Sequence, residues 1–173
     1  MEAPRDATQS QARWRWMLRS DIEAVARIER KAFRFSKHPS FQPYSLQQIA
    51  RLLREGHVSG CVLCQDGCVV AYSILGHSRD YIAIYRIAVD PDHQRSGLGT
   101  RLVQGVKRSV EACKRNKILA AVPDDLVRTQ IFFRSMGFKA LHPNGSDLYR
   151  FIWLNPPSRM ETEAFHAIIK KAF

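Results

Sequence analysis

Residues 81–100, with the sequence YIAIYRIAVDPDHQRSGLGT, decide the fold that we expect for this chain. Residues 81–89 are mostly β-branched or aromatic and carry a single charge, Arg86, which is the composition of a strand covered on both faces. The next two residues, Asp90 and Pro91, end this strand because proline has no N–H group to donate to a neighbouring strand. A glycine-containing loop and the start of a helix follow.

The loop at residues 94–100, QRSGLGT, has the features of a phosphate-binding helix N-terminus. Gly97 and Gly99 carry no Cβ where the helix begins, so successive backbone N–H groups can converge on an anion at the positive helix end. A Walker loop is excluded because it ends in Gly-Lys-Ser/Thr, whereas Gly99 is followed directly by Thr100. A dinucleotide fingerprint is excluded because Leu102 stands where it needs a third glycine.

The pattern QxxGxG at residues 94–99 follows a strand that ends in IAVDP at residues 87–91. Together they resemble the pyrophosphate loop of the GNAT superfamily of acyl-CoA-dependent N-acetyltransferases. A second stretch, FFRSMGF at residues 132–138, resembles the later helix of that family, which ends in Gly-Phe. The resemblance covers about residues 20–153, and its specific motifs lie within residues 81–137. It implies an N-acetyltransferase that moves an acetyl group from acetyl-CoA directly to a primary amine.

The resemblance also implies where acetyl-CoA, the co-substrate, binds. Its extended arm would pair with the backbone of Ile87, Ala88 and Val89, and its pyrophosphate would lie on the N–H groups of residues 95–100. This pose is physically reasonable because the arm satisfies unpaired groups at a strand edge while the helix end holds the phosphates. The residues expected to bind the cofactor are Ile87, Ala88, Val89, Gln94, Arg95, Ser96, Gly97, Leu98, Gly99 and Thr100.

The chain has 173 residues, of which 45% are hydrophobic, so it can form one buried core and is too short for two ordinary domains. We expect an α/β fold with a single-domain mixed sheet of about seven strands, GNAT-like, flanked by helices on both faces, and an extra C-terminal helix. The predicted parts are a flexible tail at 1–12, the acyl-CoA N-acetyltransferase-like domain at 13–155 and an amphipathic helix at 156–173. That helix is expected to pack on the domain, with a homodimer as the alternative.

Capping signals predict where the first two helices begin. Ser20 with Glu23 forms a capping box for a helix that ends near Phe33, and Ser45 with Gln48 forms another. In both helices apolar residues recur at helical spacing, so each should bury one face.

The strand pattern predicts a sheet that begins antiparallel and becomes parallel at its centre. The first strands include a hairpin, which an Asp-Gly turn at residues 66–67 indicates. The strands on either side of the helix that follows the glycine loop are expected to be parallel if that helix makes the usual right-handed crossover. Asp124 or Asp125 is expected to cap a later helix that ends at Gly137. The predicted strands are residues 13–18, 58–64, 68–75, 81–89, 118–122, 138–141 and 148–154.

The net charge of +11 and the isoelectric point near 10.0 raise the question of a nucleic-acid partner. The basic residues are dispersed along the chain, and no basic run is interleaved with aromatic residues as in a groove for single strands. We therefore expect a solvated basic surface, favourable to a cofactor with several phosphates, and no nucleic-acid partner. A nucleic-acid-associated basic protein is kept as a further hypothesis.

No stretch approaches the ~20 apolar residues of a membrane span, and no signal-like apolar run follows the polar N-terminus. The four cysteines are scattered, so we expect a reducing, cytoplasmic setting and no membrane partner. Cys61 and Cys64 lie three residues apart on a predicted strand and should face opposite sides of the sheet, which argues against a zinc site. We expect buried free thiols and no metal.

Apolar residues occupy the positions where the resembling family commonly holds its catalytic acid and base. Counting back from the Gly-Phe pair, the usual tyrosine acid corresponds to Phe133, and the usual base on the preceding strand corresponds to Ala121. A second base position falls at Ala83, and the asparagine often found in the later helix falls at Leu126. Amide formation still requires a neutral amine and a proton for the leaving thiolate.

Three explanations remain open for this missing polar set. In the first, other residues transfer the protons, with Tyr85 as the catalytic candidate beside Tyr149, Asp124 and Asp125. In the second, no base is needed, because an α-amino group with a pKa of ~8 is appreciably neutral at physiological pH whereas a lysine near ~10.4 is not. In the third, the chain is a non-catalytic acyl-CoA-binding sensor or interaction module.

The acceptor is an amine that the sequence does not identify, either a small molecule or a protein or peptide amine. In the resembling family the region equivalent to residues 34–44 helps to form the wall of the acceptor site. Phe35, His38, Phe41 and Tyr44 are therefore candidates to line an acceptor pocket. The equal alternative is a packed loop whose aromatic residues seal the core.

Overall fold

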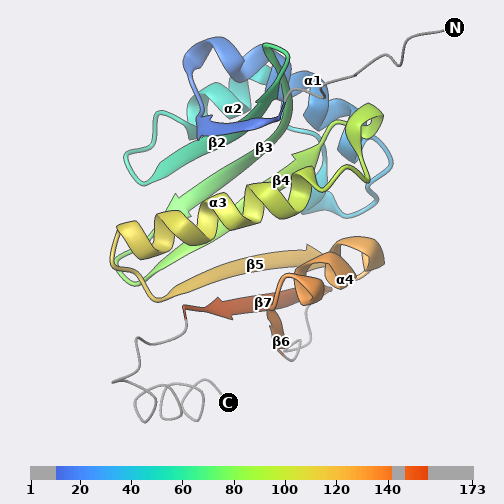
Figure 1. Cartoon of the computed structure of the whole chain (residues 1–173). Coiled ribbons are helices and arrows are strands. Elements are labelled where there is room, and N and C mark those ends of the chain that lie inside the picture. Colours follow the sequence, from blue (N-terminus) through green and yellow to red (C-terminus); the bar gives the residue numbers. More distant parts are fainter. Residues whose placement is uncertain (1–10, 142–146, 156–173) are drawn as a thin grey trace, which may run out of the picture.

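The structure, a computed structural model, describes residues 11–141 and 147–155 (Figure 1). They form a seven-stranded sheet with the order β1-β2-β3-β4-β5-β7-β6. All neighbouring strands are antiparallel except β4 and β5, which are parallel, so the predicted mixed sheet is confirmed. The strands are β1 (Arg13–Trp16), β2 (Val58–Gln65), β3 (Cys68–His77), β4 (Tyr81–Val89), β5 (Lys117–Pro123), β6 (Lys139–Leu141) and β7 (Leu148–Leu154).

Helices cover both faces of this sheet, as the sequence predicts (Figure 1). On one face lie α1 (Ile22–Phe33) and α2 (Leu46–Leu52). On the other lie α3 (Leu98–Ala112), which connects β4 to β5, and α4 (Val127–Ser135). The crossover helix α3 is what allows β4 and β5 to run parallel.

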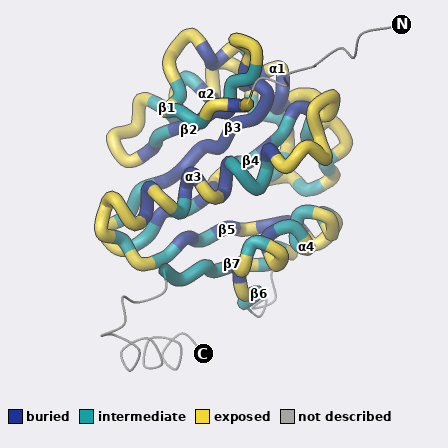
Figure 2. Tube along the Cα trace, in the orientation of Figure 1, coloured by how far each residue is buried: buried dark blue, intermediate teal, exposed yellow. Residues whose placement is uncertain are grey.

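Each face of the sheet has its own apolar core. The core under α3 and α4 includes Leu102 and Phe133, and the core under α1 and α2 includes Ile28 and Ile49. Figure 2 shows that buried residues run along the central strands, between the two helical layers. Each fully buried aliphatic or aromatic side chain contributes about 1.5–3 kcal/mol, so both layers hold the sheet in place.

Three local features, a helix cap, a hairpin turn and a helix end, have the geometry that the sequence predicts. Ser45 Oγ accepts from Gln48 N at 3.2 Å and Gln48 Oε1 accepts from Ser45 N at 2.7 Å, which is the predicted capping box of α2. The turn between β2 and β3 has positive φ at Asp66 (50°) and Gly67 (77°), as a tight hairpin requires. Gly137 follows α4 with a φ of 80°, the left-handed conformation that ends a helix.

The predicted cap of α1 is wrong. A short 3-10 helix at Arg19–Asp21 precedes α1, so Ser20 does not occupy the capping position. The carboxylate of Asp21 instead accepts from Leu18 N at 2.7 Å and from Arg15 Nη1 at 2.6 Å. Asp21 thus connects the start of α1 to β1, because its carboxylate binds both the backbone after β1 and the arginine on that strand.

The predicted cap of α4 is also wrong. The helix begins at Val127 after Leu126, which has no side-chain oxygen to offer, so neither Asp124 nor Asp125 caps it. A backbone turn takes the place of the cap, because Leu126 N donates to the carbonyl of Pro123 at 3.2 Å. The strand β5 therefore turns almost directly into α4.

Cys61 and Cys64 face opposite sides of the sheet, as predicted. Cys61 is fully buried in the core under α3, whereas Cys64 packs against the core under α1. Burial raises the pKa of the Cys61 thiol to about 12, so this thiol is unreactive at neutral pH. In the described part of the chain, no group of three or more His, Cys, Asp or Glu side chains is arranged to hold a metal ion.

The predicted C-terminal helix at 156–173 and residues 1–10 of the predicted tail lie outside the described residues. Ala12 is already buried, and its carbonyl accepts a hydrogen bond from Arg101 Nη2 on α3. Among the helices of residues 11–141 and 147–155, none is long and apolar enough to cross a membrane.

A histidine at the end of β3 joins three elements. Ser59 Oγ lies 2.6 Å from His77 Nε2, and Arg115 Nη1 lies 3.0 Å from His77 Nδ1. An arginine can only donate, so Nδ1 accepts, and the hydrogen on Nε2 points to Ser59. The serine hydroxyl is therefore a hydrogen-bond acceptor and not an activated nucleophile, and the imidazole is neutral.

We expect the free energy of unfolding to fall as the pH is lowered below 6.5. Burial, and then the charge of Arg115, lower the pKa of His77 from its ordinary value of 6.5. The unfolded chain therefore binds a proton at a higher pH than the folded chain, and stability that is complete above 6.5 is lost toward the lowered pKa. Urea unfolding at several pH values should show a smaller loss in His77→Gln. An equally steep loss in that variant would contradict this assignment.

Candidate functional site

The parallel strands β4 and β5 separate halfway along their length (Figure 1). They pair from Tyr81 with Lys117 to Ile84 with Ala120, and the pairing stops there. On the other side of β4, Leu75 pairs with Ile84 while the preceding residue of β3 already pairs with Arg86. Tyr85 is thus the extra residue of a β-bulge, which bends β4 away from β5.

The bulge changes which face of the sheet the following residues occupy. Before it, Ile82 and Ile84 lie in the core under α3. After it, Ala88 lies in the core under α1, and Ile87 packs under α3. Strict alternation would have placed Arg86 under α3 with Ile84, but it is buried under α1 instead.

A pocket of about 580 Å³ follows the gap between the strands and reaches the N-terminus of α3. We call it the large pocket to distinguish it from the small cavity beside it; a larger hollow, of about 800 Å³, lies between α1 and the start of α2. It is lined by the ends of α1 and β4, by the glycine loop and by α4. Nine of the ten residues that the sequence analysis assigns to the cofactor line it, namely Ile87, Ala88, Val89, Gln94, Arg95, Gly97, Leu98, Gly99 and Thr100. The tenth, Ser96, points elsewhere, since its hydroxyl donates to the carbonyl of His93 at 2.5 Å.

The glycine loop presents free backbone donors to the large pocket. Gly97 is the residue before α3 and has a φ of 76°, and Arg95 also has a positive φ of 64°. No side chain caps α3, so the first N–H groups of the helix are available to a ligand. Arg95 and Arg128 add positive charge to the lining. This end of the pocket suits an anion such as a pyrophosphate.

Two ion pairs connect the residues just before the glycine loop to α1. Lys31 Nζ lies 3.1 Å from Asp90 Oδ1 and 2.7 Å from Asp92 Oδ2. Asp90 also accepts from the backbone N–H of Asp92 at 3.2 Å. Figure 2 shows that the loop itself is exposed, so these contacts at its start help to hold it in place.

A second, small cavity of about 40 Å³ continues the large pocket where β4 leaves β5. The two share four lining residues, among them Phe33 and Ile87. Ala121, Phe133 and Leu126, three of the positions where the sequence lacks the expected polar groups, all line this small cavity. Among the residues that the structure describes, its lining includes no carboxylate and no imidazole, and its only charged residue is Arg86.

Tyr85 is the one catalytic candidate that the structure places at the small cavity. It is 41% exposed, and its ring covers Gly76 so closely that a Cβ there would lie 2.3 Å from the tyrosine oxygen. Gly76 pairs with Ala83, so Tyr85 and Ala83 share a face despite the bulge. Tyr149 packs against the core under α3 and lines neither cavity. Asp124 and Asp125 line neither cavity either.

The four aromatic candidates between α1 and α2 divide into two pairs. Phe35, which is 77% exposed, lines the large pocket, and Phe41 lines the small cavity. His38 Nε2 instead forms a hydrogen bond of 2.9 Å with Asp147 Oδ2, and Tyr44 packs on the guanidinium of Arg86 at 4.1 Å. The loop therefore both lines the cavities and packs on the core, and its role in an acceptor site stays a prediction.

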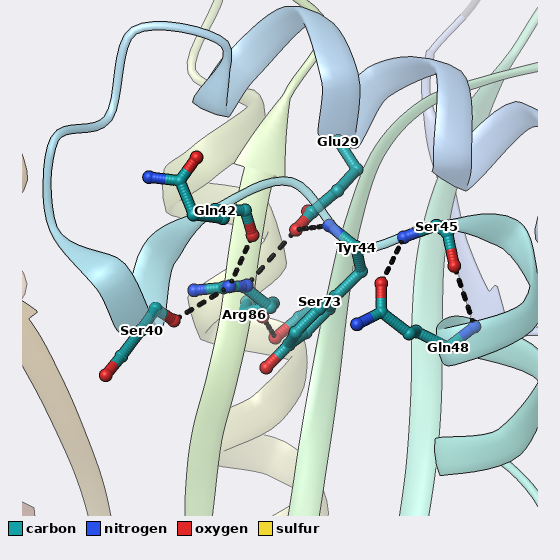
Figure 3. A network of polar contacts seen from close by, with 8 residues as sticks. All are labelled: Glu29, Ser40, Gln42, Tyr44, Ser45, Gln48, Ser73 and Arg86. Carbon is teal, nitrogen blue, oxygen red and sulfur yellow. Dashed lines mark hydrogen bonds and ion pairs between the residues drawn. The ribbon is translucent and has the colours of Figure 1, made fainter.

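The partner of Arg86 was not predicted from the sequence. Figure 3 shows this arginine between the carboxylate of Glu29 on α1 and the carbonyl groups of Ser40 and Gln42 in the loop before α2. A lone charge in an apolar strand was a visible signal that a buried partner exists. Its identity was not visible, because Glu29 lies 57 residues away in the sequence.

Known proteins share both sequence and fold with this chain. The model of the acetyltransferase (GNAT) family matches residues 22–138. The [ribosomal protein bS18]-alanine N-acetyltransferase of Escherichia coli K12 is 33% identical over 85 residues, which are 49% of this chain and 52% of that protein. The matched region thus spans about half the length of this curated relative.

Solved structures have the same fold at low sequence identity. The crystal structure of the ribosomal-protein-S18-alanine N-acetyltransferase from Escherichia coli has a TM-score of 0.68 and 22% identity, covering 82% of this chain and 91% of that one. The PaiA N-acetyltransferase of Thermoplasma acidophilum, solved with coenzyme A, has a TM-score of 0.73 and 12% identity, covering 84% and 99%. Since the family model matches more than half of its 173 residues, this chain belongs to the acetyltransferase (GNAT) family.

Proposed function

We propose that this protein is an N-acetyltransferase that moves an acetyl group from acetyl-CoA to the α-amine of a polypeptide. The observation that carries the proposal is the large pocket, which joins the free edge of β4 to the uncapped N-terminus of α3. A PaiA N-acetyltransferase of the same fold was solved with coenzyme A, which supports the same co-substrate here.

The residues of the large pocket fit acetyl-CoA. Gly97 has nothing within 4 Å of the place where a Cβ would be, so the backbone there is open to a ligand. The N–H groups of residues 97–100 and the side chains of Arg95 and Arg128 would hold the phosphates. The free edge of Ile87, Ala88 and Val89 would pair with the amides of the arm. When bound there, the cofactor supplies the activated acetyl group.

The net reaction exchanges a thioester for an amide. The amine nitrogen forms a bond to the acetyl carbon, the carbon–sulfur bond breaks, and one proton passes from the amine to the leaving thiolate, directly or through water. Tyr85 is our candidate for proton transfer, because it lines the small cavity and carries a hydroxyl group. Phe133 and Ala121 exclude water from the same place and move no proton.

The lining of the small cavity favours an α-amine over a lysine side chain. Within residues 11–141 and 147–155, the lining of this cavity includes no carboxylate or imidazole that could take a proton from an ammonium group. At pH 7.4, about 20% of α-amino groups with a pKa of ~8 are neutral, against about 0.1% of lysine side chains. The E. coli relative that acts on an alanine of ribosomal protein bS18 supports a protein α-amine as the acceptor.

The setting that we propose is the cytoplasm. All four cysteines, Cys61, Cys64, Cys68 and Cys113, are free thiols. Unpaired cysteines are typical of a reducing compartment.

A non-catalytic acyl-CoA-binding module is the second candidate. It is favoured by one observation, that Phe133 and Ala121 place apolar side chains at the cavity where the family commonly holds its acid and base. Under this alternative acetyl-CoA binds and no amine turns over.

Calorimetry with acetyl-CoA, followed by thiol release with three acceptor sets, separates these candidates. The sets are peptides with a free N-terminal amine, the same peptides with a blocked N-terminus and an internal lysine, and small amines. We expect release that is at least about tenfold faster with free α-amines than with lysine peptides. Binding without any release would favour the non-catalytic module, and a preference for lysine would contradict the α-amine proposal.

A further inference from the structure

A buried ion pair joins Arg86, a lining residue of the small cavity, to Glu29. Figure 3 shows the two side chains and the loop around them. Arg86 Nε on β4 lies 3.1 Å from Glu29 Oε1 on α1, and their side chains are 1% and 0% exposed. Burying two charges is costly, and a well-packed apolar pair is often as stable. The pair under α1 is therefore weak evidence for stability, and its other contacts indicate what else it does.

The pair holds the loop between α1 and α2 by its backbone. Arg86 Nη2 donates to the carbonyl groups of Ser40 and Gln42, each at 3.0 Å. Glu29 Oε1 accepts from the N–H of Tyr44 at 3.1 Å. Three backbone groups of one loop are thus fixed by two side chains that come from the sheet and from α1.

The same guanidinium also orders the aromatic side chains of this region. Arg86 Cζ lies 5.0 Å from the ring centroid of Phe33, 4.5 Å from that of Phe41 and 4.1 Å from that of Tyr44. Phe33 and Phe41 line the small cavity, where the proposed reaction takes place. The arginine can therefore set the position of the rings that an acceptor amine would meet.

The bulge at Tyr85 makes this arrangement available. If Tyr85 were an ordinary residue of a regular strand, Arg86 would point into the core under α3, away from the loop. The same bulge marks where the pairing of β4 with β5 ends, and so opens the large pocket. The bulge in β4 therefore both turns Arg86 toward the loop between α1 and α2 and opens the large pocket.

We propose that Arg86, held by Glu29, is a positioning residue that fixes the wall of the acceptor site without taking part in acetyl-CoA binding. This inference rests on the proposed function for the identity of the acceptor. Arg86 acts through the carbonyl groups of Ser40 and Gln42 and through the rings of Phe33 and Phe41.

The first measurement follows the loop itself and needs no substrate. Hydrogen exchange of the amides in residues 34–45 should be faster in Arg86→Met than in the parent, because the two carbonyl contacts are lost. Val106→Ala, which removes buried side-chain volume from the core under α3, is the matched control for general destabilisation. It should leave exchange in residues 34–45 as in the parent. Equal exchange in the parent and in Arg86→Met would overturn the inference whatever the acceptor is.

The second measurement separates the two substrates, with N-terminally free peptides as acceptors. Arg86→Met should raise the acceptor KM about tenfold or more through misplacement of the wall, while the Kd of acetyl-CoA stays within about twofold. Arg86→Lys should not restore the parent KM, because a point charge cannot bridge Glu29 and two carbonyl groups as the guanidinium fork does. Full rescue by lysine would overturn positioning by the fork.

The two failures can be told apart. A parent that binds acetyl-CoA but acetylates no amine overturns the proposed function, and with it the acceptor role of Arg86. Faster exchange in residues 34–45 of Arg86→Met would still show that the arginine anchors the loop. A loosened loop with an unchanged acceptor KM in an active enzyme overturns the positioning role alone.

Discussion

Gly99→Val should weaken acetyl-CoA binding at least about a hundredfold, which is about 2.7 kcal/mol, while the fold is kept. A Cβ at Gly99 would lie 3.4 Å from the ring of Phe132 and 3.8 Å from Val89, which are ordinary contact distances, so the backbone need not move. The branched side chain would then occupy the large pocket beside the first N–H groups of α3. Calorimetry with acetyl-CoA and thermal unfolding of the same sample measure the two effects.

Gly97→Val should also abolish binding, and the chain offers a matched control for its backbone strain. Gly97 and Gly67 have φ values of 76° and 77°, and neither has an atom within 4 Å of a built Cβ. Valine is strained equally at both positions, so both variants should lose similar stability. Gly67 lies in the turn between β2 and β3, where it lines neither cavity, so Gly67→Val should bind acetyl-CoA normally.

If folded Gly97→Val and Gly99→Val bound acetyl-CoA with normal affinity, the cofactor would not bind at this loop. Thr100→Ala should have a smaller effect than either, because it leaves every backbone N–H group in place.

Gly105→Ala should lower the free energy of unfolding by about 2 kcal/mol, although alanine is intrinsically the better helix former by about 1 kcal/mol. A Cβ on Gly105 would lie 2.2 Å from Trp14 Nε1 and 2.4 Å from Trp14 Cδ1. The indole is a rigid ring that also packs against Trp16 at 5.0 Å, so it cannot turn aside at low cost. The steric effect therefore exceeds the helix propensity.

Urea unfolding followed by tryptophan fluorescence measures this loss, and the fluorescence of the folded state reports movement of Trp14. Gly56→Ala is the control, since nothing lies within 4 Å of a Cβ there and its φ is not positive. It should be nearly neutral. Unchanged stability in Gly105→Ala would mean that β1 can shift over α3 without cost.

Features that depend on neighbouring residues could be predicted from the sequence. The strand at residues 81–89, the turn at Asp66 and Gly67 and the capping box at Ser45 all follow from short patterns. The glycine loop was found in the same way, because helix geometry relates the spacing of the glycines to the free N–H groups.

Features that depend on distant residues could not be predicted. Nothing in the alternation of β4 indicates that Tyr85 is an extra residue, because the bulge is set by the register against β3. The pairing of Arg86 with Glu29 follows from that bulge and from the packing of α1. The cap at Ser20 failed for a related reason, since Asp21 is held by Arg15 on β1 rather than by its own helix.

The early end of the β4–β5 pairing has a mechanical consequence. Four residue pairs join these two strands, so the sheet is continuous at one end and split at the other. Strand pairing therefore does not set the width of the split, and side-chain packing in the core under α3 joins the two strands across this seam. An extended co-substrate arm lying on the freed edge would close this seam like a short additional strand. The sheet would then be more stable with acetyl-CoA bound, so the stability of the protein would depend on the concentration of its own co-substrate.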